Sequence, residues 1–317
     1  MQKKISIGIP CFNEEGNVRE TYERITEQIE LFPQYDYEIV FSDNNSSDNT
    51  QKIIREICKK DKHVKAIFNM NNYGPERSCD NMTKRRNGDA YIAFMCDLQE
   101  PPELIGEFIR EWEAGEKIVL AQKTKSKENK IKFLFRKIYY KILEFFSDVT
   151  VYENVTGVGI TDKEVVEEIE KLELPANYPS MRTIFSQLGY DVKLISYTQK
   201  KRVNGKSSYS ISSYFDFAIN SMLYTSRKPI RITMIFGIIC STISFLVGLF
   251  YFVYKLLYWN TFDTGIAPLV IGVFLVGSIQ IALIGLIGEY IGVVINNMAK
   301  QVPVVEKELI NFEDENN

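Results

Sequence analysis

Short apolar runs alternate with helical stretches over the first 120 residues of the chain. β-rich apolar runs at 5–9, 37–41, 64–68, 90–96 and 118–121 predict strands. The segments between them, at 17–31, 50–58, 75–86 and 103–114, predict helices, of which the third is largely polar. Strands and helices that alternate at these lengths predict an α/β fold with a parallel, doubly wound sheet and right-handed crossovers.

The stretch from Gly88 to Glu103 holds the first candidate chemistry. Its apolar run ends at Asp97, Gln99 follows two residues later, and two prolines then stop the strand. On an extended chain, side chains two residues apart point the same way, so Asp97 and Gln99 would offer two oxygens to one point. Such a pair suits a hard divalent cation that takes its other ligands from phosphates and water. The alternative is an acidic turn that closes an ordinary strand.

Polar residues also follow the first two predicted strands. Asn13 and Glu14 come after the first strand, and Asp43 and Asn44 after the second. Because parallel strands end at one edge of a sheet, these residues are expected to lie beside Asp97 in a ligand crevice.

Composition narrows the class of protein. The chain has 317 residues, 45% of them apolar, and a net charge of −3, which argues against a general nucleic-acid binder. Its five cysteines show no paired spacing, and no cleavable signal peptide is visible, so we expect reduced thiols in the cytosol. The single histidine, His63, excludes a site built from several histidines.

Two long apolar stretches, at 232–257 and 267–294, dominate the C-terminal part of the chain. Each is long enough to cross a bilayer core of about 30 Å, which predicts a transmembrane hairpin. Arg227, Lys228 and Arg231 precede the first stretch and Lys300 follows the second, so both ends of the chain and everything before residue 230 are expected in the cytoplasm. We therefore expect a multi-pass protein of the cell (inner or plasma) membrane. The alternative is a pair of buried core helices.

Two further segments have amphipathic helical patterns. The basic segment 131–146 could lie on an anionic membrane surface or pack on the sheet, and the pattern does not decide between these. The segment 211–223 lies just before the first apolar stretch, so an interfacial helix is expected there.

Four motifs in order carry a family resemblance. They are Pro10-Cys-Phe-Asn-Glu-Glu, Ser42-Asp-Asn-Asn-Ser-Ser-Asp-Asn-Thr, Asp97-Leu-Gln-Glu-Pro-Pro-Glu-Leu-Ile and Gly285-Leu-Ile-Gly-Glu-Tyr-Ile-Gly. Together with the two apolar stretches they resemble family 2 nucleotide-sugar glycosyltransferases. The similar branch is the membrane-bound polyprenyl-phosphate glycosyltransferases related to dolichol-phosphate mannose synthase, of the bacterial type. The resemblance covers nearly the whole chain.

The resemblance implies a fold and a reaction. The fold is a GT-A-like doubly wound mixed sheet in residues 1–206, then an interfacial helix (207–230), a transmembrane hairpin (231–299) and an acidic cytoplasmic tail (300–317). The reaction is inverting transfer of a sugar from a nucleotide-diphosphate sugar, expected to be UDP-linked, to polyprenyl (undecaprenyl) phosphate. Mg²⁺ or Mn²⁺ is the expected cofactor. The product would supply lipid-linked sugar for cell-surface glycan modification.

The resemblance also assigns roles to residues. It implies Asp97 and Gln99 as metal ligands, and Asp97, Arg182 and Arg202 as the catalytic residues. The implied nucleotide-binding residues are Pro10, Phe12, Glu14, Asp43, Asn44 and Asp97, and the implied acceptor-phosphate residues are Arg182, Arg202, Lys206 and Ser207.

Some positions depart from the family pattern. Met95 stands where the family usually has the first Asp of its metal motif, Asp-x-Asp-x-Gln. In a separate motif, usually Asp-Asp-Gly-Ser, Asn44 stands in place of the second Asp. Gly157 and Gly159 stand where an Asp and an Arg are common, and Ser208 where a Lys is usual. These departures leave a second hypothesis open, a catalytically inactive membrane scaffold that binds a sugar nucleotide. A second enzyme hypothesis is a short polysaccharide synthase. Such an enzyme usually needs more than two spans to form a channel, so the two predicted here disfavour it. The sugar, the nucleotide base and a homo-oligomeric state stay open.

Overall fold

A computed structural model describes residues 2–125, 141, 144–145, 150, 152–172, 181–199, 228–257, 266–298 and 303–312. The described elements are, in chain order, β1 (Lys4–Cys11), α1 (Val18–Ile29), β2 (Asp36–Asp43), α2 (Thr50–Lys60), β3 (Val64–Asn69), α3 (Pro75–Lys84), β4 (Ala90–Ala93), α4 (Leu104–Glu113), β5 (Ile118–Lys125), β6 (Val155–Asp162), α6 (Lys163–Lys171), α7 (Met181–Leu188), β7 (Lys193–Thr198), α9 (Lys228–Leu257), α10 (Ile266–Met298) and β8 (Glu306–Ile310). Every strand and helix that the sequence predicts before residue 121 is present.

The sheet is mixed, with strand order β7-β5-β6-β4-β1-β2-β3-β8. Strands β4, β1, β2 and β3 run parallel, whereas β6 lies antiparallel to both of its neighbours, β4 and β5. This confirms the GT-A-like mixed sheet. The alternation of strands and helices alone predicted a parallel sheet. That holds for the strands it covered, β1 to β5, which all run in one direction, whereas β6 and β8 run the opposite way. The alternation does not indicate that β6 enters the sheet between β4 and β5, in the opposite direction.

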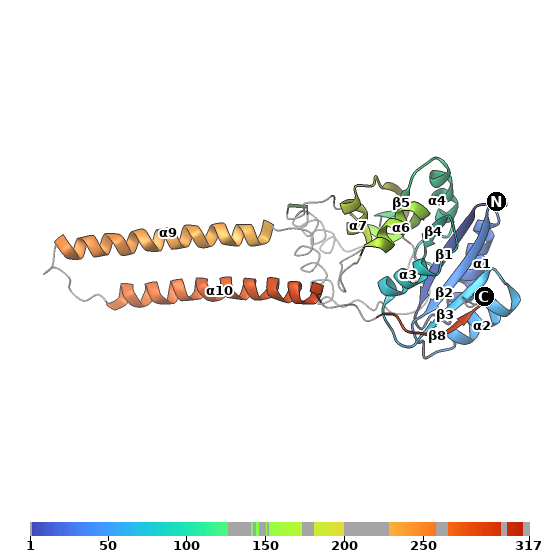
Figure 1. Cartoon of the computed structure of the whole chain (residues 1–317), viewed down its shortest axis with the longest axis horizontal. Coiled ribbons are helices and arrows are strands. Elements are labelled where there is room, and N and C mark those ends of the chain that lie inside the picture. The colour runs from blue at the N-terminus through green and yellow to red at the C-terminus, as the bar shows by residue number, and fades with distance from the viewer. Residues whose placement is uncertain are drawn as a thin grey trace.

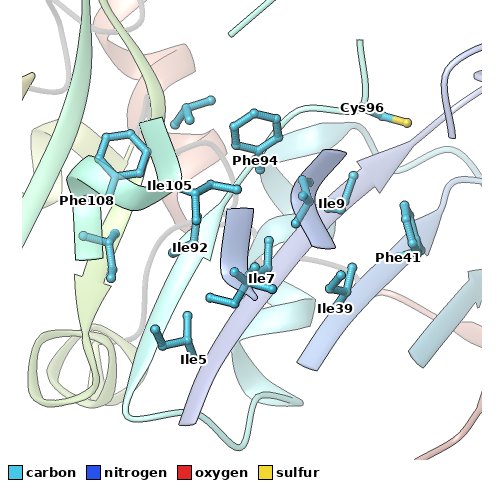
Figure 2. Close-up of a cluster of buried hydrophobic side chains, with 14 of the residues drawn as sticks. Ile5, Ile7, Ile9, Ile39, Phe41, Ile92, Phe94, Cys96, Ile105 and Phe108 are labelled. Atoms are coloured by element: carbon cyan, nitrogen blue, oxygen red, sulfur yellow. The ribbon is translucent and has the colours of Figure 1, made fainter. Parts of the chain in front are cut away.

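The core forms around β1, which lies in the middle of the sheet. Ile5, Ile7 and Ile9 of this strand are fully buried. Figure 2 shows them together with side chains of β2, β4 and α4, among them Phe41 and Phe108. A strand covered on both faces reads as a continuous apolar run, and this explains why the pattern predicted the central strands well.

Strand β4 is shorter than the apolar run that predicted it. The run extends to Cys96, but the strand ends at Ala93. Phe94 and Cys96 lie beyond the strand, yet their side chains are buried in the same core. At its last positions the apolar run therefore reflects burial and not extended backbone, and Asp97 lies in a turn instead of directly after a strand.

The segment expected to be an acidic tail contains the last strand of the sheet. Strand β8 pairs antiparallel with β3, with Ile310 opposite Ala66 and Leu309 opposite Ile67. Its two acidic side chains make ion pairs, Glu306 with Arg85 and Glu308 with Arg55. The sheet thus includes residues from the far end of the chain, beyond the expected domain boundary at 206.

Helices α9 and α10 extend side by side away from the sheet domain (Figure 1). They touch at Gly237, where an added Cβ would lie 3.6 Å from Leu283 Cδ1. Both predicted stretches are therefore helical. Among the described residues, however, no helix combines the length and the apolarity needed to cross a membrane, so the two transmembrane spans are not supported. Apart from residues 141, 144 and 145, the amphipathic segments 131–146 and 211–223 lie outside the described residues.

Candidate active site

Backbone and side-chain hydrogen bonds join the loops that follow β1 and β2. The Asn13 amide donates to Ser46 Oγ (2.9 Å), and the Ser47 amide donates to Asn13 Oδ1 (2.9 Å). One residue on, the Glu14 amide donates to Thr50 Oγ1 (2.8 Å). Asn13 has φ = 55°, a left-handed conformation that asparagine tolerates better than most residues. These hydrogen bonds therefore hold the two loops side by side at the carboxyl edge of the sheet.

Asp43 lies at the end of β2, in register with Cys11 of β1, and is fully buried. Its carboxylate accepts hydrogen bonds from the Ser46 amide (3.0 Å), the Ser46 hydroxyl and the Gln51 side chain (2.7 Å). These donors fix the orientation of the carboxylate and satisfy its charge. The nucleotide-binding role of Asp43 stays a prediction, and the structure adds that Asp43 holds the β2–α2 loop.

Asn44 organises the loop between β3 and α3. Its Oδ1 accepts from Ser78 Oγ (2.8 Å), Asn69 Nδ2 (3.1 Å) and the Tyr73 amide (3.4 Å). Its Nδ2 donates to the Gly74 carbonyl (3.5 Å). An aspartate at this position could not make that last contact, because a carboxylate has no N–H. Asn44 is only 2% exposed, so the structure assigns it to holding this loop, and its nucleotide-binding role stays a prediction.

The three predicted nucleotide-binding residues of the first loop differ in exposure. Pro10 is buried in β1 opposite Ser42, and Glu14 accepts a hydrogen bond from Asn17 Nδ2 (2.5 Å). Phe12 is 42% exposed at the polar edge of the sheet. An exposed aromatic ring in this position is suited to stacking on a nucleotide base.

A turn brings Asp97 and Gln99 together. The Gln99 amide donates to Asp97 Oδ1 (3.2 Å), and Leu98 between them has φ = 53°. The expectation that extended backbone aligns the two side chains is therefore wrong, because a left-handed residue reverses the chain there. The side-chain oxygen of Gln99, Oε1, accepts from Gln199 Nε2 (2.7 Å).

These two residues fit a divalent cation. An ionised carboxylate has about four lone-pair positions and an amide oxygen two, so accepting a hydrogen bond does not by itself prevent either group from binding a metal. One carboxylate with an amide oxygen suffices for a metal that takes other ligands from diphosphate and water. The Met95 thioether is a poor ligand for such an ion. Within the described residues, no group of three His, Cys, Asp or Glu side chains could hold a metal.

The end of β7 is tied to the same turn by two side chains that sequence reasoning missed. Tyr197 donates its hydroxyl to Glu100 Oε1 (2.8 Å), and Gln199 bonds Gln99 as described. Glu100 is 4% exposed, and burial raises the pKa of its carboxyl. Because Tyr197 and Gln199 lie about 100 residues away, no local pattern connects them with the turn.

Comparison with known proteins identifies the family. The sequence profile of Glycosyl transferase family 2 matches residues 6–170, which is more than half of the chain. The chain belongs to glycosyl transferase family 2. It is 32% identical over 290 residues to the bactoprenol glucosyl transferase of Shigella phage SfV, covering 91% of this chain and 93% of that protein. It is 29% identical to the prophage bactoprenol glucosyl transferase homolog of Escherichia coli K12, covering 91% of this chain and 94% of that protein.

Solved structures agree with this glycosyltransferase in fold. Glucosyl-3-phosphoglycerate synthase from Mycobacterium tuberculosis, in complex with Mn²⁺ and UDP-glucose, superposes with a TM-score of 0.50 at 17% identity. The match covers 70% of this chain and 79% of that chain. At this identity the likeness supports the GT-A fold alone.

Two glycines of this glycosyltransferase stand where the family often has an Asp and an Arg, and both have a structural reason. Gly159 lies in β6 between Ala93 and Leu120, and a Cβ there would collide with the Val119 carbonyl oxygen. Gly157 has φ = 88°, which disfavours other residues. The close approach of β5 to β6 therefore excludes any larger side chain at Gly159 in this fold.

The predicted acceptor-phosphate residues fall largely outside the described part of the chain. Arg182 is in the first turn of α7, which begins at Met181, and its side chain is not among those described. Arg202, Lys206 and Ser207 lie outside the described residues. The roles assigned to these four residues stay predictions.

Gln199→Ala is expected to weaken metal binding by about 10-fold, because outer-shell partners orient metal ligands. Mn²⁺ binding in the presence of UDP, followed by electron paramagnetic resonance, measures the change. Gln122→Ala is a matched control, since Gln122 lies in β5, the strand beside β7, and donates its side-chain amide to the Glu153 carbonyl. Equal Mn²⁺ affinity in the wild type and in Gln199→Ala would contradict an orienting role for Gln199.

Proposed function

We propose that this glycosyltransferase moves a sugar from a UDP-linked donor to a polyprenyl phosphate, with inversion at the anomeric carbon. The observation that carries the proposal is that the Asp97–Gln99 turn and the joined loops after β1 and β2, with Asp43, follow neighbouring parallel strands. They therefore share the edge of the sheet that is expected to bind the donor. The relatives named bactoprenol glucosyl transferases, which match over almost their whole length, support the lipid acceptor.

The donor half of the reaction depends on residues at this edge. Phe12 would stack on the base, and Asp43 and the β1–α1 loop would hold the nucleoside. Asp97 and Gln99 would hold Mg²⁺ or Mn²⁺. When bound there, the ion supplies positive charge that stabilises the nucleoside diphosphate as it leaves.

The acceptor half needs little help from a base. A phosphate monoester has a second pKa near 6, so a polyprenyl phosphate is largely dianionic at pH 7. Such a nucleophile attacks the anomeric carbon directly from the face opposite the leaving group. The tasks left to the protein are positioning and charge neutralisation, which Arg182, Arg202, Lys206 and Ser207 would perform.

Location at the cytoplasmic face of the cell membrane is part of the proposal. Large apolar side chains are exposed along both long helices, among them Ile235, Leu246 and Phe250 of α9 and Leu269, Ile281 and Ile291 of α10. Exposed apolar surface of this extent favours contact with lipid, and in our proposal α9 and α10 form the membrane hairpin. Tags before Met1 and after Asn317 should then both report cytoplasm, with Asp263 outside.

Purified protein with Mn²⁺, a panel of UDP- and GDP-sugars and short-chain polyprenyl phosphate tests the reaction. We expect one UDP-sugar to give a glycosylated lipid and free UDP. The substitution of the first metal-site Asp by Met95 favours a second candidate, a sugar-nucleotide-binding scaffold. Donor binding without any lipid product across the panel would support the scaffold and contradict the transferase.

A further inference from the structure

The chain returns from α10 to the sheet domain at Val305. The Val305 carbonyl accepts from the Met70 amide (2.9 Å), and the Val305 amide donates to the Tyr73 hydroxyl (3.3 Å). Both partners belong to the loop between β3 and α3, residues 70–74, which we call the 70–74 loop. The C-terminal segment therefore contacts this loop before it forms β8.

The 70–74 loop is in turn bonded to Asn44, the residue next to Asp43. The Tyr73 amide donates to Asn44 Oδ1 (3.4 Å), and Asn44 Nδ2 donates to the Gly74 carbonyl (3.5 Å). A continuous set of contacts thus runs from Val305 through Tyr73 to Asn44 at the donor edge.

Glu306 provides a second connection through α3. Its carboxylate accepts from Asn81 Nδ2 (2.6 Å) and from the Arg85 guanidinium (3.0 Å). The Glu306 side chain is only 14% exposed in this ion pair. Helix α3 begins directly after the 70–74 loop, and its Ser78 donates to Asn44 Oδ1 (2.8 Å). Glu306 therefore holds the helix that anchors the loop.

Glu308, two residues along the same strand, provides a natural contrast. It also forms an ion pair, with Arg55 of α2 (2.7 Å), and is 43% exposed. Helix α2 precedes β3 and does not follow the 70–74 loop. The two glutamates thus make similar contacts with different helices, and only the contacts of Glu306 lead to Asn44.

We propose that Val305 and Glu306 are positioning residues for the donor site, which they serve by holding the 70–74 loop and Asn44. The inference rests on the proposed binding of a nucleotide donor at this edge. A loop that must be ordered on binding lowers affinity, and these contacts order it beforehand. Val305 comes seven residues after Met298, where α10 ends, so the same segment connects the long helices with the donor site.

The test compares Glu306→Ala with Glu308→Ala in the full-length protein. Isothermal titration with UDP in the presence of Mn²⁺ should show about 10-fold weaker binding for Glu306→Ala, since it loses charge-assisted hydrogen bonds on α3. Glu308→Ala should bind UDP like the wild type. In sugar transfer, Glu306→Ala should raise the donor KM with kcat largely kept.

Tyr73→Phe tests the same inference in case Glu306→Ala fails to fold. It removes only the hydroxyl that accepts from Val305, and it keeps the ring that contacts the Arg77 guanidinium (4.8 Å). We expect about fivefold weaker UDP binding with an unchanged melting temperature. Wild-type UDP affinity in both Tyr73→Phe and folded Glu306→Ala would overturn the inference alone. A wild-type protein that binds neither UDP nor GDP would overturn the proposed function together with the inference.

Discussion

Asp97→Asn is expected to lower kcat for sugar transfer by about a thousandfold, which corresponds to about 4 kcal/mol of lost transition-state stabilisation. The substitution removes the negative charge that would hold the metal against the donor diphosphate. Asparagine keeps the side-chain shape, and its Oδ1 can still accept the Gln99 amide hydrogen bond that forms the turn. The protein should therefore stay folded, with an unchanged melting temperature.

Glu103→Gln is the matched control for Asp97→Asn. Glu103 is a nearby acidic residue whose carboxylate, 56% exposed, pairs with Arg24 on the surface. Losing that exposed pair should change stability by less than about 1 kcal/mol and leave transfer intact. Full turnover by Asp97→Asn with Mn²⁺ present would show that the turn after β4 is an ordinary acidic turn that binds no metal.

Lys65→Met is expected to destabilise the folded protein by about 3–5 kcal/mol, because it leaves a buried carboxylate without its counter-ion. Glu38 is fully buried in β2, and its Oε2 lies 2.7 Å from Lys65 Nζ on β3. The Ser6 hydroxyl and the Asn87 amide donate to the other carboxylate oxygen. Thermal melting of the full-length protein measures the loss.

The double variant Glu38→Gln with Lys65→Met separates charge from packing. It removes both charges, so it should recover much of the stability that Lys65→Met loses. Equal melting temperatures for the single and the double variant would mean that lost packing, rather than the unpaired carboxylate, destabilises Lys65→Met.

The same ion pair predicts how stability depends on pH. Burial acts to raise the pKa of Glu38, but the hydrogen bonds from Lys65, Ser6 and Asn87 outweigh it and leave the pKa lowered. A carboxyl with a lowered pKa in the folded state stabilises the protein above its unfolded pKa, about 4.3. That stability is lost as the pH falls through the folded pKa. The double variant should therefore lose less stability below about pH 4 than the wild type.

Much of the fold could be predicted from the sequence because it depends on local periodicity. In strand β1, Ile5, Ile7 and Ile9 share one buried face of the sheet, and this alternation is visible in the sequence whatever strands lie beside it. The helical segments at α1 and α2 follow from apolar residues on one face. The candidate site residues that follow β1, β2 and β4 were found in the same way, since polar residues after a buried strand mark the carboxyl edge of a sheet.

The sequence by itself thus determined the order of elements from β1 to β5, the edge that carries Asp43 and Asp97, and the helical nature of 232–257 and 267–294. Only the tertiary structure decided which distant residues support that edge. Ile310 pairs with Ala66, Gln199 bonds Gln99, and Glu306 holds α3, each across about 100 residues or more. Such contacts follow from strand order and direction, and these depend on how the whole chain packs. A periodic pattern records only whether a side chain is buried, and it carries no information on the partner that buries it.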